Sequence, residues 1–118
     1  MITGVHAIVF TNDPPGVRAF FRDVLALPSV DAGGDWPIFA LPPAELAVHP
    51  SDTDGHQQLY LMCDDIEATV EELERKGVVF TTAIADVGWG LMTRLRLPDG
   101  SELPLYEPKH PSPLGLGG

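Results

Sequence analysis

The chain has 118 residues, of which 44% are hydrophobic, and this is enough for one packed core, in one domain or in two small fused halves. Its 17 acidic and 7 basic residues give a formal net charge of −10. This balance argues against nucleic acid as a partner, because phosphate contacts need clustered Lys and Arg. It leaves a cationic ligand open, since excess negative charge attracts positive solutes.

Cysteine content and hydropathy predict the compartment. Cys63 is the only cysteine, so no intrachain disulfide can form, which fits a reducing cytosol. No stretch has the pattern of a signal peptide, and no apolar run is long enough to span a membrane. We therefore expect a cytoplasmic protein with no membrane partner.

The first half of the chain begins with a predicted strand, residues 2–10, in which both faces are mostly apolar. A helix capped by Asn12 or Asp13 follows, with Pro14-Pro15 in its first turn and its end at Leu27-Pro28. The apolar stripe of this helix comprises Val17, Phe20, Phe21, Val24 and Leu25.

Short strands are predicted after this helix. Gly33-Gly34 is a turn, strands are expected at about 36–41 and 45–49, and there is room for another around 29–32. The polar, turn-rich segment 51–55 is the expected linker between the two halves.

The second half repeats this order of elements. A strand over 56–63 is followed by a helix that Asp64 or Asp65 caps and that ends near Gly77. The buried stripe of the helix comprises Ile66, Val70 and Leu73. Further strands are expected at about 78–84, 91–97 and 102–107, the last two joined by a Pro98–Ser101 hairpin turn.

The repeat places a histidine early in each half, because His6 and His56 are 50 positions apart and each begins or nearly begins an apolar strand. Side chains alternate along a strand, so both histidines are expected on the face opposite the covering helix. The residues expected beneath the two helices are Val5, Ala7 and Val9 in the first half, and Leu59, Leu61 and Cys63 in the second. If the halves pair, the two histidines would face a shared cleft.

The strand-initial His6 and the segments 56–73 and 88–107 resemble the vicinal oxygen chelate superfamily, which includes glyoxalase I, bleomycin-resistance proteins and type I extradiol dioxygenases. The resemblance covers residues 1 to about 108. It implies an α+β fold in which two βαβββ modules form a curved mixed sheet around a cleft. Module one would span about 1–50 and module two about 56–108, within a single domain 1–110 that a flexible tail, 111–118, follows.

In metal-using members, the resemblance implies a divalent ion, Fe, Zn, Mn or Ni, with His6 and His56 as two of its ligands. The third ligand is usually a glutamate at the position of Pro104, and proline offers no ligand atom, so the metal could be absent here. Glu102 or His49 could complete the set. Two histidines and a carboxylate suit non-haem Fe(II), whereas three imidazoles suit zinc.

Several large side chains are candidates for the wall of an apolar ligand pocket, although aromatics at such positions also build cores. These candidates are Trp36, Phe39, Tyr60, Met62, Trp89 and Tyr106. Arg94 either anchors an anionic substrate group or faces water.

Two functions fit these residues. The first, which the paired histidines favour by a small margin, is a metal-dependent enzyme of the glyoxalase or extradiol dioxygenase type, with Glu102 as ligand or base and a substrate that has vicinal oxygens. The second is a metal-free protein that sequesters a cationic or aromatic small molecule, which the acidic balance and Pro104 favour. The resemblance also implies a homodimer, with or without exchange of modules.

Overall fold

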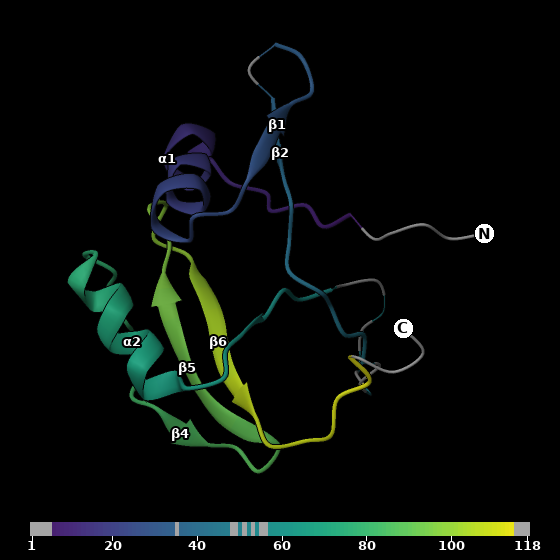
Figure 1. The fold of residues 1–118 in the computed structure, drawn as a ribbon, viewed down its shortest axis with the longest axis vertical. Helices are drawn as coiled ribbons and strands as arrows, with labels where there is room; N and C mark the ends of the chain where they lie inside the picture. The colour runs from purple at the N-terminus through teal and green to yellow at the C-terminus, as the bar shows by residue number, and fades with distance from the viewer. Residues whose placement is uncertain are drawn as a thin grey trace.

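The computed structural model describes residues 6–34, 36–47, 50, 52, 54 and 57–114. It has a mixed α+β fold with two sheets. The smaller sheet pairs β1 (Ser29–Asp31) with β2 (Pro37–Phe39), and the larger has four strands in the order β3 (Leu61–Met62), β6 (Glu102–Pro108), β5 (Gly90–Arg96) and β4 (Ala85–Asp86). Figure 1 shows the small sheet at one end of the molecule and the larger sheet at the other. Among the described residues, none of the helices has the length and apolarity needed to cross a membrane.

The first helix, α1 (Pro14–Ala19), begins where the sequence predicts. Asp13 is its N-cap, and the Oδ1 atom of Asp13 accepts a hydrogen bond from the Gly16 amide at 3.1 Å. A five-residue π-helix, η1 (Phe20–Val24), continues it directly, and Ala26 then adopts a φ of +56° that ends the helical path. The helical segment therefore ends shortly before the predicted Leu27-Pro28.

The second helix, α2 (Ile66–Arg75), also follows the sequence pattern. Of the two candidate caps, Asp65 is the one whose carboxylate accepts from a helix amide, that of Ala68, at 3.1 Å. Ile66 and Leu73 are buried, as their spacing predicts. Gly77 follows with a φ of +89°, the left-handed conformation expected of a residue that ends a helix.

The larger sheet is built on the hairpin of β5 (Gly90–Arg96) and β6 (Glu102–Pro108). Its turn is the predicted one, with Gly100 at a φ of +90°. β3 (Leu61–Met62) runs parallel to β6, and β4 (Ala85–Asp86) runs antiparallel to β5.

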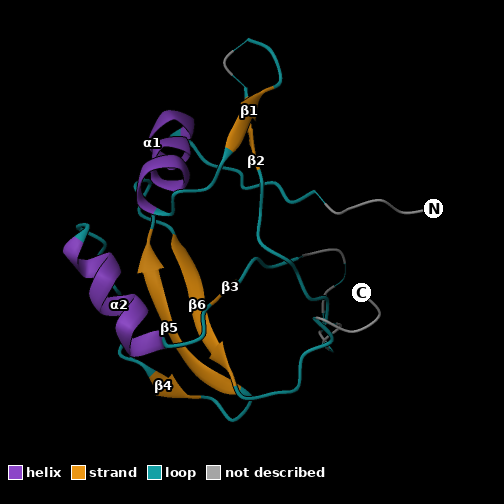
Figure 2. Cartoon of the chain, viewed as in Figure 1, coloured by secondary structure: helices purple, strands orange, loops and turns teal. Residues whose placement is uncertain are grey.

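One side of this sheet packs on the helices (Figure 2). The buried cluster comprises Phe20, Leu73, Val78, Leu95, Leu97 and Leu103. Leu59 and Leu61 pack against it, which confirms their predicted placement on the helix-covered face. Because side chains alternate along strands, their neighbours Tyr60 and Met62 face the other side.

Parts of the predicted first half differ from the structure. Residues 6–10 form no strand, and Ile8 and Phe10 are 65% and 88% exposed, because no other described segment pairs with this backbone. Residues 45–47 also form no strand, since Glu45 is held by side-chain contacts instead of a sheet ladder. Among the described residues of this half, the strands that form are β1 (Ser29–Asp31) and β2 (Pro37–Phe39), an antiparallel pair around the predicted Gly33-Gly34 turn. Residues 2–5 and 48–49 of the predicted strands lie outside the described residues.

Two strands of the second half are shorter than predicted. Of the predicted 56–63 strand, the described part begins at residue 57, and within it β3 is the strand that forms, while residues 57–60 have no ladder. From the predicted 78–84 strand, Phe80 forms an isolated bridge to Leu95. At Thr82 the contact with β5 is made by a side chain, because the buried Thr93 hydroxyl donates to the Thr82 carbonyl at 2.7 Å. Backbone pairing with β5 is regular in β4, which follows.

Candidate functional site

The side of the larger sheet away from α2 carries most of the predicted ligand-binding residues, and we call it the aromatic face. Cross-strand register aligns Met62 of β3, Tyr106 of β6 and Met92 of β5 on this side. Tyr60 and Trp89, which lie just outside the strands, contact the same surface through their rings. The strands therefore bring together side chains from residues 60 to 106.

Tyr60, Trp89 and Tyr106 form a cluster of mutual edge contacts. The ring centroids are 5.1 Å apart for Trp89 and Tyr106, 5.9 Å for Tyr60 and Tyr106, and 6.2 Å for Tyr60 and Trp89, with interplanar angles of 75°, 86° and 80°. These are the edge-to-face arrangements that ring quadrupoles favour. Tyr106 is buried, whereas Trp89 is 43% exposed and offers ring surface to a ligand.

Gly90 permits this packing. A Cβ atom at that position would lie 2.8 Å from the Glu107 carbonyl oxygen and 3.1 Å from a ring carbon of Tyr106. Such distances are too short for carbon, so only glycine lets the Trp89 end of β5 approach β6 this closely.

Two residues outside the predicted site join Tyr106. Its hydroxyl lies 3.3 Å from Glu45 Oε1 and 3.1 Å from His110 Nε2, and His110 Nε2 lies 3.7 Å from the same Glu45 oxygen. Burial, and then the charge of Glu45, raise the pKa of the Tyr106 hydroxyl, so it remains a protonated donor at neutral pH. The sequence predicts Glu45 in a strand and His110 after the last strand, with no local signal that either meets Tyr106.

The predicted metal ligands are placed only in part. His6 lies in the exposed segment 6–10, while His49 and His56 are outside the described residues. Glu102 is exposed and accepts a hydrogen bond from the Thr81 hydroxyl. Among the described residues, no three His, Cys, Asp or Glu side chains gather closely enough to hold a metal ion, so these residues do not by themselves fit such a centre.

Pro104 and Arg94 face each other across β6 and β5, on the aromatic face. The position at which the resemblance predicts a glutamate ligand thus carries a buried proline, with Arg94 as its cross-strand neighbour. Arg94 itself is partly buried.

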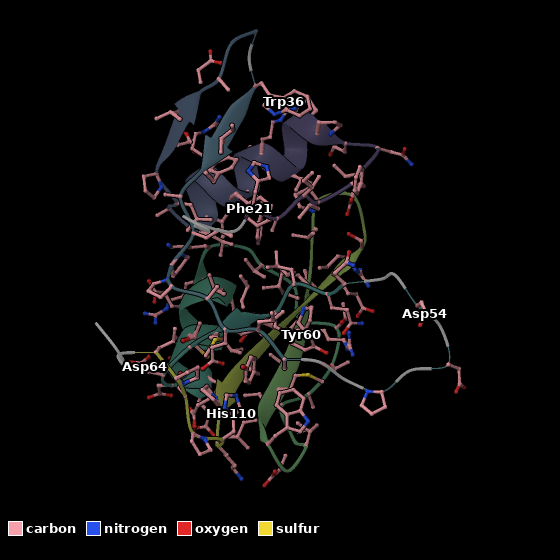
Figure 3. The ribbon with its side chains drawn as sticks, turned by 90° about the vertical axis from the view of Figure 1, so that its right-hand side faces the viewer. Phe21, Trp36, Asp54, Tyr60, Asp64 and His110 are labelled. Carbon is pink, nitrogen blue, oxygen red and sulfur yellow. The ribbon has the colours of Figure 1, made fainter. Side chains whose placement is uncertain are left out.

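Trp36 is separated from the aromatic face. It is 60% exposed beside β2, where the Arg18 guanidinium lies 5.0 Å from its ring centroid. Figure 3 shows Trp36 at one end of the molecule and Tyr60 and His110 toward the other. The structure therefore does not bring Trp36 into contact with the other predicted pocket residues.

A cavity of about 390 Å³ opens at the end of β3, next to the aromatic face. Its lining residues are Met62, Cys63, Asp64, Glu107 and Pro108. Met62 belongs to both surfaces, so an occupant of the cavity would lie close to the aromatic side chains. Burial raises the pKa of the Cys63 thiol, and nearby carboxylates raise it further, so this cysteine is not activated. The Glu107 carboxylate has a structural role, because its Oε1 accepts a hydrogen bond from the Ile66 amide at 3.0 Å.

Residues 4–105 match the family model described as the Glyoxalase/Bleomycin resistance protein/Dioxygenase superfamily. The chain belongs to this superfamily. No curated protein matches it at a significant level.

Solved structures in and around the superfamily share the fold. TnmS3, an antibiotic binding protein from Streptomyces sp. CB03234, is 22% identical with a TM-score of 0.67, over 92% of this chain and 98% of that one. A superfamily member from Sphaerobacter thermophilus is 23% identical with a TM-score of 0.62, over 90% and 98% of the two chains. Lactoylglutathione lyase from Agrobacterium tumefaciens is 15% identical with a TM-score of 0.63, over 89% and 92%. Both binding proteins and enzymes thus share the architecture of this superfamily member.

Proposed function

We propose that this superfamily member binds a small aromatic molecule on its aromatic face and does so without a metal ion. The observation that carries the proposal is the Tyr60–Trp89–Tyr106 cluster, in which a 43% exposed indole stands beside a buried tyrosine ring. Such a surface stacks flat apolar groups, and Met62 and Met92 add adaptable contacts at its edge. The shared fold of the antibiotic-binding TnmS3 supports the same class of function.

Charge extends the proposal to aromatic cations. The chain carries a net charge of −10, and Glu45 stands beside the Tyr106 ring that forms part of the cluster. Electron-rich ring faces and nearby carboxylates both favour a positive ligand. A planar organic cation would therefore use the stacking surface and the carboxylate together.

The candidate metal-ligand residues support binding that does not need a metal ion. Pro104 offers no ligand atom, Arg94 stands opposite it, and Glu102 accepts from Thr81. His6 lies in an exposed segment outside any strand.

The second candidate is the metal-dependent enzyme, which the repeated histidines His6 and His56 favour and which the shared fold of a lactoylglutathione lyase supports. In that case the two histidines, with Glu102 or His49, would hold the ion, and the ion would supply Lewis-acid stabilisation to a substrate with vicinal oxygens.

Architecture and assembly belong to the same proposal. The order β3, α2, the Phe80 bridge and β4, β5, β6 supports a βαβββ module in the second half. We propose that the first half completes an equivalent module when a second copy pairs with it in a cytoplasmic homodimer. The exposed apolar side chains of residues 6–10, together with Leu46, which is 93% exposed, support this arrangement.

Binding and metal dependence can be tested separately. Calorimetry would measure the affinity of two probes, N-methylquinolinium and neutral 2-naphthylmethanol, for protein purified without chelator and then treated with EDTA. The variants are Trp89→Ala in the cluster, His56→Ala, and the matched exposed truncation Val79→Ala, which lies at the other end of β5 beside Arg96. Metal content would be measured before the chelator is added.

The proposal expects binding that survives EDTA and His56→Ala, is unchanged in Val79→Ala, and weakens roughly tenfold or more in Trp89→Ala, as loss of a stacked ring predicts. Stoichiometric metal together with loss of binding in His56→Ala would instead support the enzyme. Equal affinity of wild type and Trp89→Ala would remove the aromatic face as the site.

A further inference from the structure

The segment that follows β6 lies beside the aromatic cluster, and three of its residues are held there by contacts. The Lys109 amide donates to the Trp89 carbonyl at 2.9 Å, and the Lys109 ammonium pairs with Asp86 at 2.6 Å. His110 then contacts Tyr106, with ring centroids 5.8 Å apart, and the Ser112 hydroxyl donates to Glu45 Oε2. His110 is therefore fixed against the proposed binding surface by its neighbours on both sides.

Donor and acceptor counting shows that the three contacts among Glu45, Tyr106 and His110 depend on one proton. His110 Nδ1 lies 2.7 Å from the Pro111 carbonyl, an acceptor only, so Nδ1 carries hydrogen. In the neutral ring, Nε2 must then accept the Tyr106 proton, and the Tyr106 oxygen has none left for Glu45 Oε1, 3.3 Å away. In the imidazolium, Nε2 donates to Tyr106 and Tyr106 donates to Glu45, so every contact is satisfied.

Charge points in the same direction. The titratable side chains that the described residues place against the His110 ring are Glu45 and Tyr106, while the cation next in sequence, Lys109, is turned to Asp86 of β4. The imidazolium would neutralise Glu45 at 3.7 Å, and the Glu45 side chain is only 13% exposed, so few water molecules compete. When the imidazolium loses its proton, Glu45 loses both this charge partner and the Tyr106 donor.

We infer that His110 controls the charge that Glu45 presents to a ligand, so that the aromatic face binds aromatic cations more tightly as pH rises. At acid pH the His110 imidazolium forms an ion pair with the Glu45 carboxylate, and a cationic ligand would have to replace the imidazolium in that pair. Above the range in which histidine titrates, about pH 5 to 8, the carboxylate is free to accept the ligand's charge. A neutral aromatic ligand gains nothing from this change. The inference rests on the proposed binding function, and it specifies how pH changes the preference for a cationic over a neutral ligand.

The test compares the same two probes at about pH 5.5 and pH 8, which lie on either side of the ordinary histidine pKa of about 6.5. N-Methylquinolinium is permanently charged, and 2-naphthylmethanol is neutral throughout, so neither probe titrates. Calorimetry would be carried out on wild type, His110→Gln and Glu45→Gln, with Glu72→Gln on the exposed side of α2 as a charge-matched control for Glu45. Tyr106 ring signals in NMR spectra without ligand would report the contact itself.

For wild type and Glu72→Gln we expect N-methylquinolinium to bind roughly tenfold more tightly at the higher pH, the effect of one charge-assisted contact. In His110→Gln and in Glu45→Gln this difference should fall below about twofold, with high affinity kept in the first variant and lost in the second. Wild-type Tyr106 signals should move between the two pH values, and those of His110→Gln should not.

An undiminished pH difference in His110→Gln, or an equal one for the neutral probe, would overturn the inference while leaving aromatic binding intact. Failure of both probes to bind wild type would defeat the proposed function. In that case the Tyr106 signals still decide whether His110 controls the contact with Glu45, because they need no ligand.

Discussion

The hydroxyl of Tyr106 lies 3.3 Å from Glu45 Oε1 although the two residues are 61 positions apart in the chain. One residue belongs to the second strand of the main hairpin, and the other to a segment between the two sheets. Their contact attaches the first half of the chain to the aromatic face of the second. It also places a carboxylate at the edge of the ring cluster, where we propose that its charge affects ligand choice.

Removal of the hydroxyl in Tyr106→Phe should destabilise the fold. The buried ring would stay in place, but Glu45 and His110 would both lose a partner, at a cost of about 1.5 kcal/mol in the free energy of unfolding for a bond to a charged group. Urea unfolding monitored by circular dichroism measures this cost. Tyr60→Phe is the matched control, because the Tyr60 hydroxyl donates to the exposed Gln58. Its loss should lower the free energy of unfolding by less than about 0.5 kcal/mol. Equal losses in the two variants would show that the Glu45 contact is not stabilising.

The start of α2 allows a comparison of two adjacent aspartates. Asp65→Ala removes the carboxylate that accepts from the Ala68 amide and should lower the free energy of unfolding by about 1 kcal/mol. Asp64→Ala removes the same charge one position earlier, where the carboxylate makes no bond to the helix, and should lie within about 0.5 kcal/mol of wild type. Thermal or urea unfolding distinguishes them, and a larger loss for Asp64→Ala would contradict the assigned cap.

Cys63 should alkylate slowly near neutral pH. Burial raises the pKa of its thiol, so at a given pH below that value the folded protein holds less thiolate than an exposed cysteine, whose ordinary pKa is about 8.5. The rate with iodoacetamide at about pH 8 should therefore be several-fold lower than in urea-unfolded protein and should rise further as pH increases. Mass spectrometry follows the reaction. A folded-state rate equal to the unfolded rate would show that the thiol is neither buried nor perturbed.

The exposed segment 6–10 should be part of the proposed dimer contact. Sedimentation equilibrium of wild type is expected to give twice the 12.7 kDa chain mass. Phe10→Asp places a charge at an apolar side chain that is 88% exposed and should shift the equilibrium toward monomer, because a contact between copies would bury that charge. Val79→Asp, at a 55% exposed position next to Phe80, is the matched control and should not shift it. Unchanged association in both variants would remove residues 6–10 from the interface.

Local signals in the sequence predicted the elements whose backbone hydrogen bonds are completed by nearby residues. Asn12 or Asp13, and Asp64 or Asp65, were expected to cap the helices, and Asp13 and Asp65 do so because the amides that they accept from lie three residues away. The β5–β6 hairpin follows from its turn, since Gly100 can adopt a positive φ at no cost. Residues 6–10 belong to a predicted strand that is mostly apolar on both faces, yet a strand also needs a partner for its backbone, and an apolar pattern cannot supply one.

The superfamily was recognised by resemblance, and the two helices were predicted from caps and apolar spacing, which act over a few neighbouring positions. Tyr60, Trp89 and Tyr106 were candidates for a ligand pocket, and the structure shows that their rings contact one another. Only the tertiary structure brought Glu45 and His110 to Tyr106 and kept Trp36 beside Arg18. The physical reason is that these contacts join side chains from segments without a shared local pattern, so their pairing depends on how the sheet, the helices and the segment after β6 pack together.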